Sequence, residues 1–326
     1  MKGAYDIIVK NRRIQYKFTI FRNITILKGD SATGKTTLIE MIAAYQDNGE
    51  ASGVSINCSC NCVVLTSNNW KINLDSFQNC IVFIDEGNPF VNSKEFADSV
   101  KNSSNYFVLV TRQSLYNLPY SITEIYGIKN VSANKYQQTK RLYSSFYKLY
   151  EQKTLKILKP DLVIVEDAKS GYQFFKHLFS QFSIQCISAS GKSKIYSEII
   201  KTSAENILVI ADGAAFGAEI ESIISLMTVK NLGIYLPESF EWLILNSGLI
   251  KENKISDILA SPCDYIDSQK YFSWEIFFTD LLKKSTHGTY LEYSKSKLNP
   301  AYLQEKEIRT ISGQIPDEIL IQNNPK

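Results

Sequence analysis

The sequence predicts an α/β protein of two domains, and three observations lead to this class. The chain has 326 residues, which is about the length of two ordinary domains. A glycine-rich loop at residues 29–36 stands between a short β-branched run and a helical stretch. After residue 160, apolar runs of strand length alternate with helical stretches, a pattern typical of βαβ units on a parallel sheet.

The chain begins with two strand-like runs, residues 5–9 and 14–20, which are separated by a turn that contains Asn11. Two alternating runs joined by a short polar turn predict an antiparallel hairpin. The hairpin leads directly into residues 24–27, the strand before the glycine-rich loop.

The loop fits the pattern G-x-x-x-x-G-K-[ST] of a phosphate-binding loop. Its residues are Gly29, Asp30, Ser31, Ala32, Thr33, Gly34, Lys35 and Thr36, followed by Thr37. Glycines allow successive N–H groups to turn toward phosphate oxygens, and the following helix adds its positive N-terminal end. In such loops the lysine reaches the β- and γ-phosphates and the hydroxyl holds Mg²⁺. The expected ligands are therefore ATP and Mg²⁺.

Two further apolar strands end in polar residues that suit the same site. Residues 80–84 lead into Asp85 and Glu86, and residues 106–110 lead into Thr111 and Arg112. At the carboxyl end of a parallel strand, Asp85 is expected to bind Mg²⁺ and Glu86 to polarise the attacking water. Thr111 and Arg112 are candidates for sensing the γ-phosphate, with a capped, solvated loop as the equal alternative.

These features resemble the P-loop ATPases, and the leading hairpin resembles the opening of ABC-type ATPase heads. The sequence between Thr36 and Asp85 contains no L-S-G-G-Q signature and no long coiled-coil insertion. Residues 1–133 are therefore expected to form a minimal P-loop ATPase domain on a parallel sheet. Lys35 and Glu86 are its expected catalytic residues.

Two stretches within and after this domain have competing interpretations. Cys58, Cys60 and Cys62 alternate with polar residues, which favours one face of a core strand over a thiol metal site. Residues 134–159 are rich in tyrosine and lysine. Their apolar spacing predicts a connecting helix with a basic face, and a stacking surface for nucleic acid is the alternative.

The second half, residues 160–245, carries a different set of polar strand ends. Glu166 ends the first strand, Ser190-Gly191-Lys192-Ser193 follows the second, and Asp212-Gly213 ends the third. This pattern resembles a TOPRIM domain, and the order of the two halves resembles OLD-type nucleases, in which an ATPase precedes the TOPRIM domain. The resemblance implies that Glu166 and Asp212 bind Mg²⁺ for phosphodiester chemistry, and that Lys192 contacts phosphate.

This half departs from the TOPRIM pattern at Ala214, which stands where a second aspartate is expected. Loss of a carboxylate weakens a Mg²⁺ site. Glu219 and Asp167 are candidate substitutes, and whether the site is active stays open. Residues 246–326 read as a mostly helical C-terminal extension.

Composition sets limits on function and location. The net charge of +3 does not by itself indicate a nucleic-acid-binding protein, and no apolar run approaches the length of a membrane span. A cytoplasmic, non-membrane protein is expected, with DNA or RNA, a second copy of the chain or another protein as open partners. The expected function is ATP hydrolysis coupled to a TOPRIM-like nuclease or nucleic-acid-binding domain, in the setting of defence against foreign DNA that the OLD-type resemblance implies. The alternatives are a nucleotide-gated binding or signalling module and a small-molecule kinase.

Overall fold

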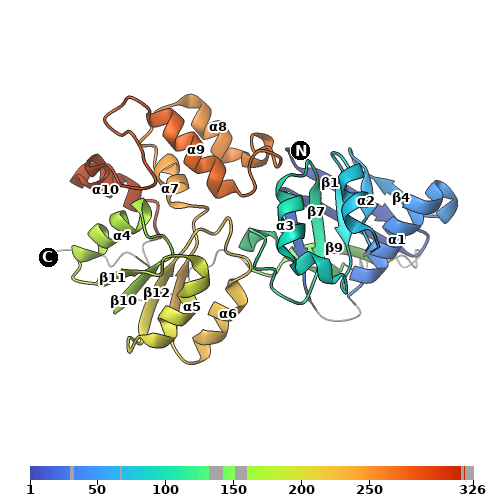
Figure 1. The fold of residues 1–326 in the computed structure, drawn as a ribbon, viewed down its shortest axis with the longest axis horizontal. Coiled ribbons are helices and arrows are strands. Elements are labelled where there is room, and N and C mark those ends of the chain that lie inside the picture. Colours follow the sequence, from blue (N-terminus) through green and yellow to red (C-terminus); the bar gives the residue numbers. More distant parts are fainter. Residues whose placement is uncertain (30–32, 67, 132–141, 151–159, 317–318, 320–326) are drawn as a thin grey trace. The chain divides into compact units, whose positions relative to one another are not determined.

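The computed structural model describes residues 1–29, 33–66, 68–131, 142–150, 160–316 and 319. The chain forms two compact units (Figure 1). The first contains residues 1–151 together with 261–272, and the second contains residues 152–260 and 273–326. Both units contain helices and strands, which confirms the α/β class, and the first division between them follows residue 151.

The first unit is built on a nine-stranded mixed sheet in the order β4-β1-β2-β9-β8-β3-β7-β6-β5. Its strands are β1 (Tyr5–Lys10), β2 (Ile14–Ile20), β3 (Ile24–Leu27), β4 (Ser55–Asn57), β5 (Cys62–Val64), β6 (Ile81–Ile84), β7 (Tyr106–Val110), β8 (Ile125–Asn130) and β9 (Leu142–Lys148). β1 and β2 form the expected antiparallel hairpin. Five strands, β8-β3-β7-β6-β5, run parallel to one another. The expectation of a parallel sheet therefore holds for this half, and the complete sheet is mixed.

The two edge strands of this sheet, β4 and β5, are joined only by residues 58–61. A four-residue link has a short reach, so the sheet curves until its edges approach each other. The continuous core strand expected through the three cysteines is wrong: Cys58 and Cys60 lie in the link and only Cys62 lies in a strand. The alternation of apolar residues is correct, but Ser59 and Asn61 are exposed where the chain passes from one edge to the other. We refer to this link as the seam.

The connecting helix expected over 134–159 is also wrong where this range is described, because residues 142–148 form strand β9. Residues 132–141 and 151–159 lie outside the described part. β9 pairs parallel with β2 and antiparallel with β8. Phe146 stacks on Phe18 of β2 with ring centroids 3.9 Å apart. The spacing of four residues that suggests one helix face also fits one face of a strand, and aromatic packing decides in favour of the strand.

Helices α1 (Lys35–Asn48), α2 (Trp70–Ser76) and α3 (Lys94–Lys101) complete the first unit (Figure 1). α1 buries Leu38 and Ile42 in the core beneath the sheet. The segment 261–272, which the sequence places in the C-terminal extension, packs with this unit. Gly3 N donates to Cys263 O at 2.7 Å, and Asn23 Nδ2 donates to Phe272 O at 3.0 Å.

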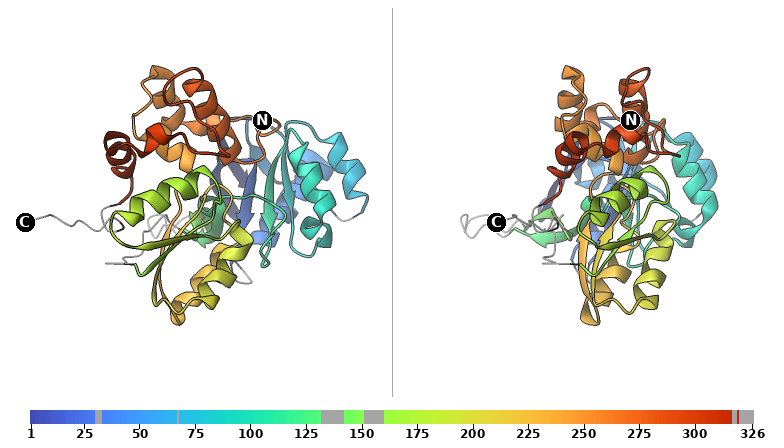
Figure 2. Two further views of the ribbon diagram at one scale, coloured as in Figure 1. Left: turned by 60° about the vertical axis from the view of Figure 1, so that its left-hand side comes forward. Right: turned by 90° about the vertical axis from the view of Figure 1, so that its left-hand side faces the viewer.

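The second unit contains a parallel four-stranded sheet in the order β11-β10-β12-β13. The strands are β10 (Leu162–Val165), β11 (Gln185–Ser188), β12 (Asn206–Ile210) and β13 (Asn231–Tyr235), and the intervening helices are α4 (Ser170–Ser180), α5 (Lys192–Lys201) and α6 (Ile220–Ser225). Figure 2 shows α4 on one face of this sheet and α5 with α6 on the other. This is the arrangement that right-handed crossovers require. The βαβ prediction is confirmed.

The remaining helices of the second unit gather on the side of α4 (Figures 1 and 2). They are α7 (Phe240–Asn246), α8 (Asn253–Ala260), α9 (Trp274–Thr286) and α10 (Glu305–Ser312). Phe240 of α7 packs against Phe174 and Phe175 of α4. This contact brings α7 over the carboxyl ends of the strands, where the polar residues lie. Within the described ranges, no helix is both long enough and apolar enough to cross a membrane.

Candidate functional site

The strand register of the first unit brings the expected site residues to one edge of the sheet. Leu27, at the end of β3, is paired with Val110 of β7, and Ile84 of β6 is paired with Leu109. The carboxyl ends of these parallel strands therefore meet at one level. In open α/β sheets, ligands bind outside the carboxyl ends of the strands.

In the described part of the glycine-rich loop, the lysine binds the loop itself. Lys35 Nζ donates to Gly29 O at 2.8 Å and to Thr33 Oγ1 at 2.9 Å. Gly29 and Gly34 have φ values of 120° and 90°, which favour glycine. Asp30, Ser31 and Ala32 lie outside the described residues.

Helix α1 begins at Lys35, and by sequence its first turn carries no carboxylate. Its positive end is therefore not neutralised from within the helix. Thr36 and Thr37 are exposed at this end. This is a suitable place for a bound anion.

Tyr16 of β2 contacts the loop through its hydroxyl group, and no sequence pattern predicts this contact. Its hydroxyl donates to Gly34 O at 2.8 Å. A Cβ added at Gly34 would lie 2.7 Å from this hydroxyl, so the position has no room for a side chain. Burial raises the pKa of Tyr16 to about 12, while a hydrogen bond with Thr37 acts in the opposite direction. Tyr16 therefore stays a neutral donor at physiological pH.

Asp85 and Glu86 follow β6, whose four residues are all buried. Asp85 Oδ1 accepts the N–H of Glu86 at 2.8 Å, and Asn88 Nδ2 donates to Asp85 O at 2.8 Å. These bonds fix the turn after the strand. Asp85 is half-buried and Glu86 is exposed. These exposures would suit a metal ligand at Asp85 and a water-orienting group at Glu86.

The end of β7 contributes two residues with different roles. Thr111 is buried, and its N–H donates to Leu27 O at 3.1 Å while its hydroxyl donates to Gln113 O at 3.0 Å. Arg112 forms an ion pair with Glu86, with Nε and Oε1 2.8 Å apart. The side chains of Arg112 and Glu86 are 61% and 39% exposed. The expected water-orienting carboxylate is thus held by the arginine of the neighbouring strand.

The donor types at this edge suit Mg²⁺, which prefers oxygen ligands. The Thr36 hydroxyl and the Asp85 carboxylate are the residues that would hold it, as expected from the sequence. Among the described residues, no group of three or more His, Cys, Asp or Glu side chains forms a metal-binding cluster. A site made from one hydroxyl, one carboxylate and substrate phosphates needs no such cluster.

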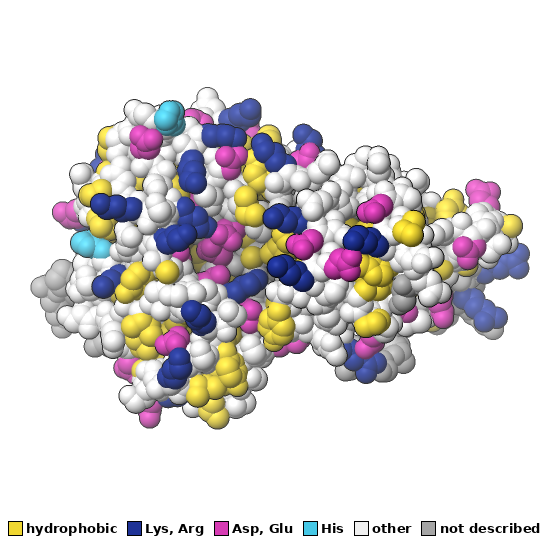
Figure 3. Space-filling view, in the orientation of Figure 1, with side chains coloured by type: hydrophobic (Ala, Val, Ile, Leu, Met, Phe, Trp, Pro, Cys, Tyr) yellow, Lys and Arg dark blue, Asp and Glu magenta, His cyan; other side chains and the backbone are white. Residues whose placement is uncertain are grey.

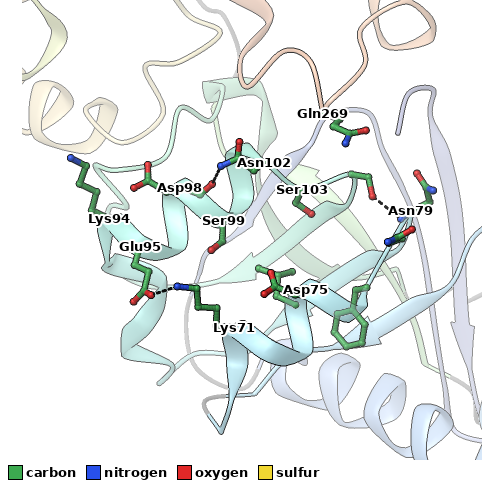
Figure 4. Close-up of a pocket in the computed structure, with 14 residues that line it drawn as sticks. Lys71, Asp75, Asn79, Lys94, Glu95, Asp98, Ser99, Asn102, Ser103 and Gln269 are labelled. Carbon is green, nitrogen blue, oxygen red and sulfur yellow. Dashed lines mark hydrogen bonds and ion pairs between the residues drawn. The ribbon is translucent and has the colours of Figure 1, made fainter.

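Another pocket of the first unit lies between α2 and α3 (Figure 4). It has a volume of about 850 Å³ and is lined by polar residues that include Lys71, Glu95, Asn79 and Ser103. Asn79 and Ser103 precede β6 and β7, so this pocket opens at the amino ends of the parallel strands. It is therefore at the opposite edge of the sheet from Lys35.

The second unit has a smaller pocket, of about 260 Å³, at the carboxyl ends of β10 and β12. Glu166 and Asp212 both line it, as expected from the sequence. The N–H of Asp212 donates to Glu166 Oε2 at 3.1 Å. Burial raises the pKa of Glu166 to about 7, and burial together with the nearby Glu275 and Glu166 raises the pKa of Asp212. Both carboxyl groups hold their protons more tightly than in water, because burial and neighbouring negative charges disfavour their charged forms.

Four further charged residues line this pocket and are not predicted as site residues from the sequence: Lys169, Glu241, Glu275 and Lys295. Lys295 Nζ contacts Glu275 Oε1 and lies 3.7 Å from Glu241 Oε1. Glu241 also accepts a hydrogen bond from the buried Tyr293 hydroxyl at 2.8 Å. Glu241 has one sequence signal, its place in the first turn of a helix after a strand. Glu275 and Lys295 have none, because they come from distant elements that only the fold brings together.

The other expected residues of this half lie around the pocket in structural roles. Asp167 lines the pocket, but its carboxylate accepts the N–H groups of Lys169 and Gly171 at the start of α4. Lys192 Nζ donates to Ala215 O at 2.7 Å. Glu219 does not line the pocket, so it does not replace the carboxylate that Ala214 lacks. The additional carboxylates come from Glu241 and Glu275 instead.

Charges of both signs are mixed over the face of the molecule seen in Figure 3. This mixture agrees with the small net charge of the sequence. The candidate sites are therefore defined by local groups and not by a broad basic surface on this face.

A scan against protein-family models finds no match for this chain, and a search of curated proteins finds none either. The geometry of the two sites is thus the basis for a functional proposal.

Proposed function

We propose that the first unit binds and hydrolyses ATP with Mg²⁺ at the carboxyl edge of its parallel strands. The observation that carries the proposal is the register of β3, β7 and β6, which brings the strand ends Leu27, Val110 and Ile84 to one level, so that the residues after these strands share one edge. A strand thus separates the phosphate-loop strand from the acidic strand. This spacing leaves room between them for the γ-phosphate and a water molecule, since neighbouring strands are about 4.8 Å apart.

The residues of this edge have distinct roles in the proposed reaction. The N–H groups of the loop and the start of α1 bind the phosphates, and Lys35 exchanges its bonds to Gly29 and Thr33 for phosphate oxygens. Glu86 orients and polarises the attacking water once its ion pair with Arg112 opens. Thr36 and Asp85 are the residues that would hold Mg²⁺, and the ion would supply positive charge to the β- and γ-phosphates. A terminal Asp-Glu pair favours water over a metabolite hydroxyl as the nucleophile, which supports hydrolysis over a kinase.

The test is phosphate release from ATP by the wild-type chain, Glu86→Gln and Glu95→Gln. Glu95 is an exposed carboxylate on α3 and serves as the matched control. We expect Glu86→Gln to lower turnover by roughly 10²-fold or more while keeping ATP binding, because a positioned base contributes on that scale. Equal turnover in all three proteins would refute the role of Glu86. Transfer of labelled phosphate to a small molecule would favour the kinase.

For the second unit we propose a metal-dependent site that binds the backbone of nucleic acid. The pocket of about 260 Å³ has room for a phosphate group but is small for a whole nucleotide. Glu166 and Asp212 are the residues that would hold Mg²⁺, and Lys295 is a cation within the same pocket. Hard carboxylate ligands beside a lysine suit phosphodiester chemistry. TOPRIM-like cleavage of DNA or RNA is the activity that this combination favours.

The test uses linear, nicked and single-stranded DNA and also RNA, with Mg²⁺ or Mn²⁺, in the presence and absence of ATP. Cleavage that is lost in Glu166→Gln and kept in Glu205→Gln, an exposed carboxylate of the same unit, would support the nuclease. Intact nucleic acids with continued ATP hydrolysis would refute it. That result would favour a nucleotide-gated binding or signalling module.

A further inference from the structure

Three thiols converge at the seam between the edges of the first sheet. The sulfur atoms of Cys58 and Cys60 are 3.8 Å apart, and Cys62 begins the next strand two residues further on. All six cysteines of the chain are free thiols. The ATPase and nuclease proposals use none of them.

The seam differs from the strands beside it because Cys58 and Cys60 take no part in strand pairing. Cys58 and Cys60 lie between β4 and β5, outside the strand ladder, and each is half-buried. Ser59 and Asn61, which alternate with them, are exposed. The two sulfurs therefore face the same side and are accessible to small molecules, while neither is fixed by strand pairing.

The hydrogen bonds among the thiols shift their pKa values in opposite directions. Bonds from the thiols of Cys60 and then Cys62 lower the pKa of Cys58, because they stabilise its thiolate. The bond to Cys58 and burial raise the pKa of Cys60. Thiolates react with peroxides and thiols do so poorly, so Cys58 has the character of the attacking group and Cys60 that of the resolving group.

We propose that Cys58 and Cys60 are a peroxide-sensitive pair that closes to a reversible disulfide. The sulfurs must approach from 3.8 Å to about 2.0 Å, which a link outside the strand ladder permits. The proposal does not depend on the ATPase or nuclease activity.

The chemistry balances with hydrogen peroxide as oxidant. The Cys58 thiolate attacks one peroxide oxygen, the O–O bond breaks, and hydroxide leaves and takes up a proton to give water and Cys58 sulfenic acid. The Cys60 sulfur then attacks the Cys58 sulfur, the S–O bond breaks, and a second water leaves with the thiol proton. Two thiols are oxidised by two electrons and one peroxide is reduced. A dithiol reductant reverses the step by thiol–disulfide exchange.

The test is differential thiol labelling of the wild-type chain. The folded protein is treated with a small excess of hydrogen peroxide and then denatured, its remaining thiols are blocked with N-ethylmaleimide, and its disulfides are reduced and labelled with iodoacetamide. Fragment ions from the peptide that contains residues 58–62 assign the labels. We expect the second label on Cys58 and Cys60 at least tenfold more often than on Cys186 or Cys263, which are buried. Dithiothreitol before blocking should remove the difference.

Two variants identify the roles of the pair. Cys60→Ser should leave Cys58 as a sulfenic acid that dimedone captures, and Cys58→Ser should abolish peroxide labelling at Cys60. Cys263→Ser, in the same unit, is the control and should leave the pair unchanged. The proposal is overturned if Cys58 and Cys60 keep the first label after peroxide. It is also overturned if Cys62 is the partner, or if oxidation proceeds directly to sulfinic acid.

Discussion

Glu166 carries a charge that the folded protein disfavours, and this gives a quantitative prediction for Glu166→Gln. Burial raises the pKa of this carboxyl from 4.5 to about 7. A shift of this size corresponds to about 3 kcal/mol between the two protonation states. Glutamine resembles the protonated form and keeps an oxygen that can accept the N–H of Asp212.

The sign follows from proton binding in the two states. Between pH 4.5 and about pH 7 the folded protein retains a proton that the unfolded chain has lost. The stability of the wild-type protein therefore falls as pH rises through this window. Glu166→Gln lacks this loss, so it should equal the wild type near pH 4.5 and be more stable by up to about 3 kcal/mol at pH 8.

Calorimetric unfolding at pH 5, 6, 7 and 8 measures this difference. For a unit of this size, 3 kcal/mol corresponds to a rise of roughly 6–12 °C in the Tm of the second unit at pH 8. The control Glu205→Gln should show the same pH dependence as the wild type. A Glu166→Gln variant that is less stable than the wild type at pH 8 would show that the charged carboxylate is stabilised, which contradicts the account of the pocket.

Three further predictions concern single contacts. Gly34→Ala places a Cβ 2.7 Å from the Tyr16 hydroxyl at a φ of 90°, so it should lower the free energy of unfolding by about 1–3 kcal/mol. It should also weaken the thermal stabilisation that nucleotide produces. An unchanged stabilisation by nucleotide would contradict the loop geometry. Arg112→Ala breaks an exposed ion pair worth about 1 kcal/mol or less, so the unfolding temperature in calorimetry should change little. Basal ATP hydrolysis should rise because Glu86 is released. A raised KM with lower turnover would assign the arginine to phosphate binding instead. Lys295→Met leaves the buried Glu241 and the half-buried Glu275 without their cation and should destabilise the second unit by about 2–4 kcal/mol. Lys284→Met at an exposed i,i+4 pair should change the stability by less than about 1 kcal/mol. Equal effects of the two lysine variants in thermal unfolding would refute this.

The sequence is a good guide to strands and their carboxyl ends. The apolar runs before Lys28, Asp85 and Asp212 are buried strands, because a parallel strand covered on both faces must be apolar along its whole length. Polar residues directly after such strands then fall at one edge. The carboxylates of Glu166 and Asp212 are brought together for this reason.

The wrong predictions concern two stretches whose local sequence pattern fits two different structures. Leu142 and Phe146 suit a helix face or a strand face equally, and stacking on Phe18 selects the strand. The cysteine alternation suits a strand, but the closing of the sheet turns Cys58 and Cys60 into a link. Contacts between distant segments decide both cases, and these contacts cannot be predicted from local periodicity alone.

Contacts between distant residues also explain what is missing from the predicted site. Lys295 is more than eighty residues beyond Asp212 in sequence, and only the packing of the C-terminal helices on the sheet brings it to the pocket. Tyr16 contacts the glycine-rich loop from β2, which β9 and β8 separate from β3 in the sheet.

The affinity for Mg²⁺·ATP, measured by titration calorimetry on the wild-type chain, Lys35→Ala and Lys71→Ala, tests the central claim most directly. Lys35 lies at the carboxyl edge of the parallel strands and Lys71 lines the larger pocket at their amino ends. We predict one site in the wild type, at least tenfold weaker binding in Lys35→Ala, and unchanged binding in Lys71→Ala. Weaker binding in Lys71→Ala with full affinity in Lys35→Ala would place the nucleotide at the opposite edge and contradict the account.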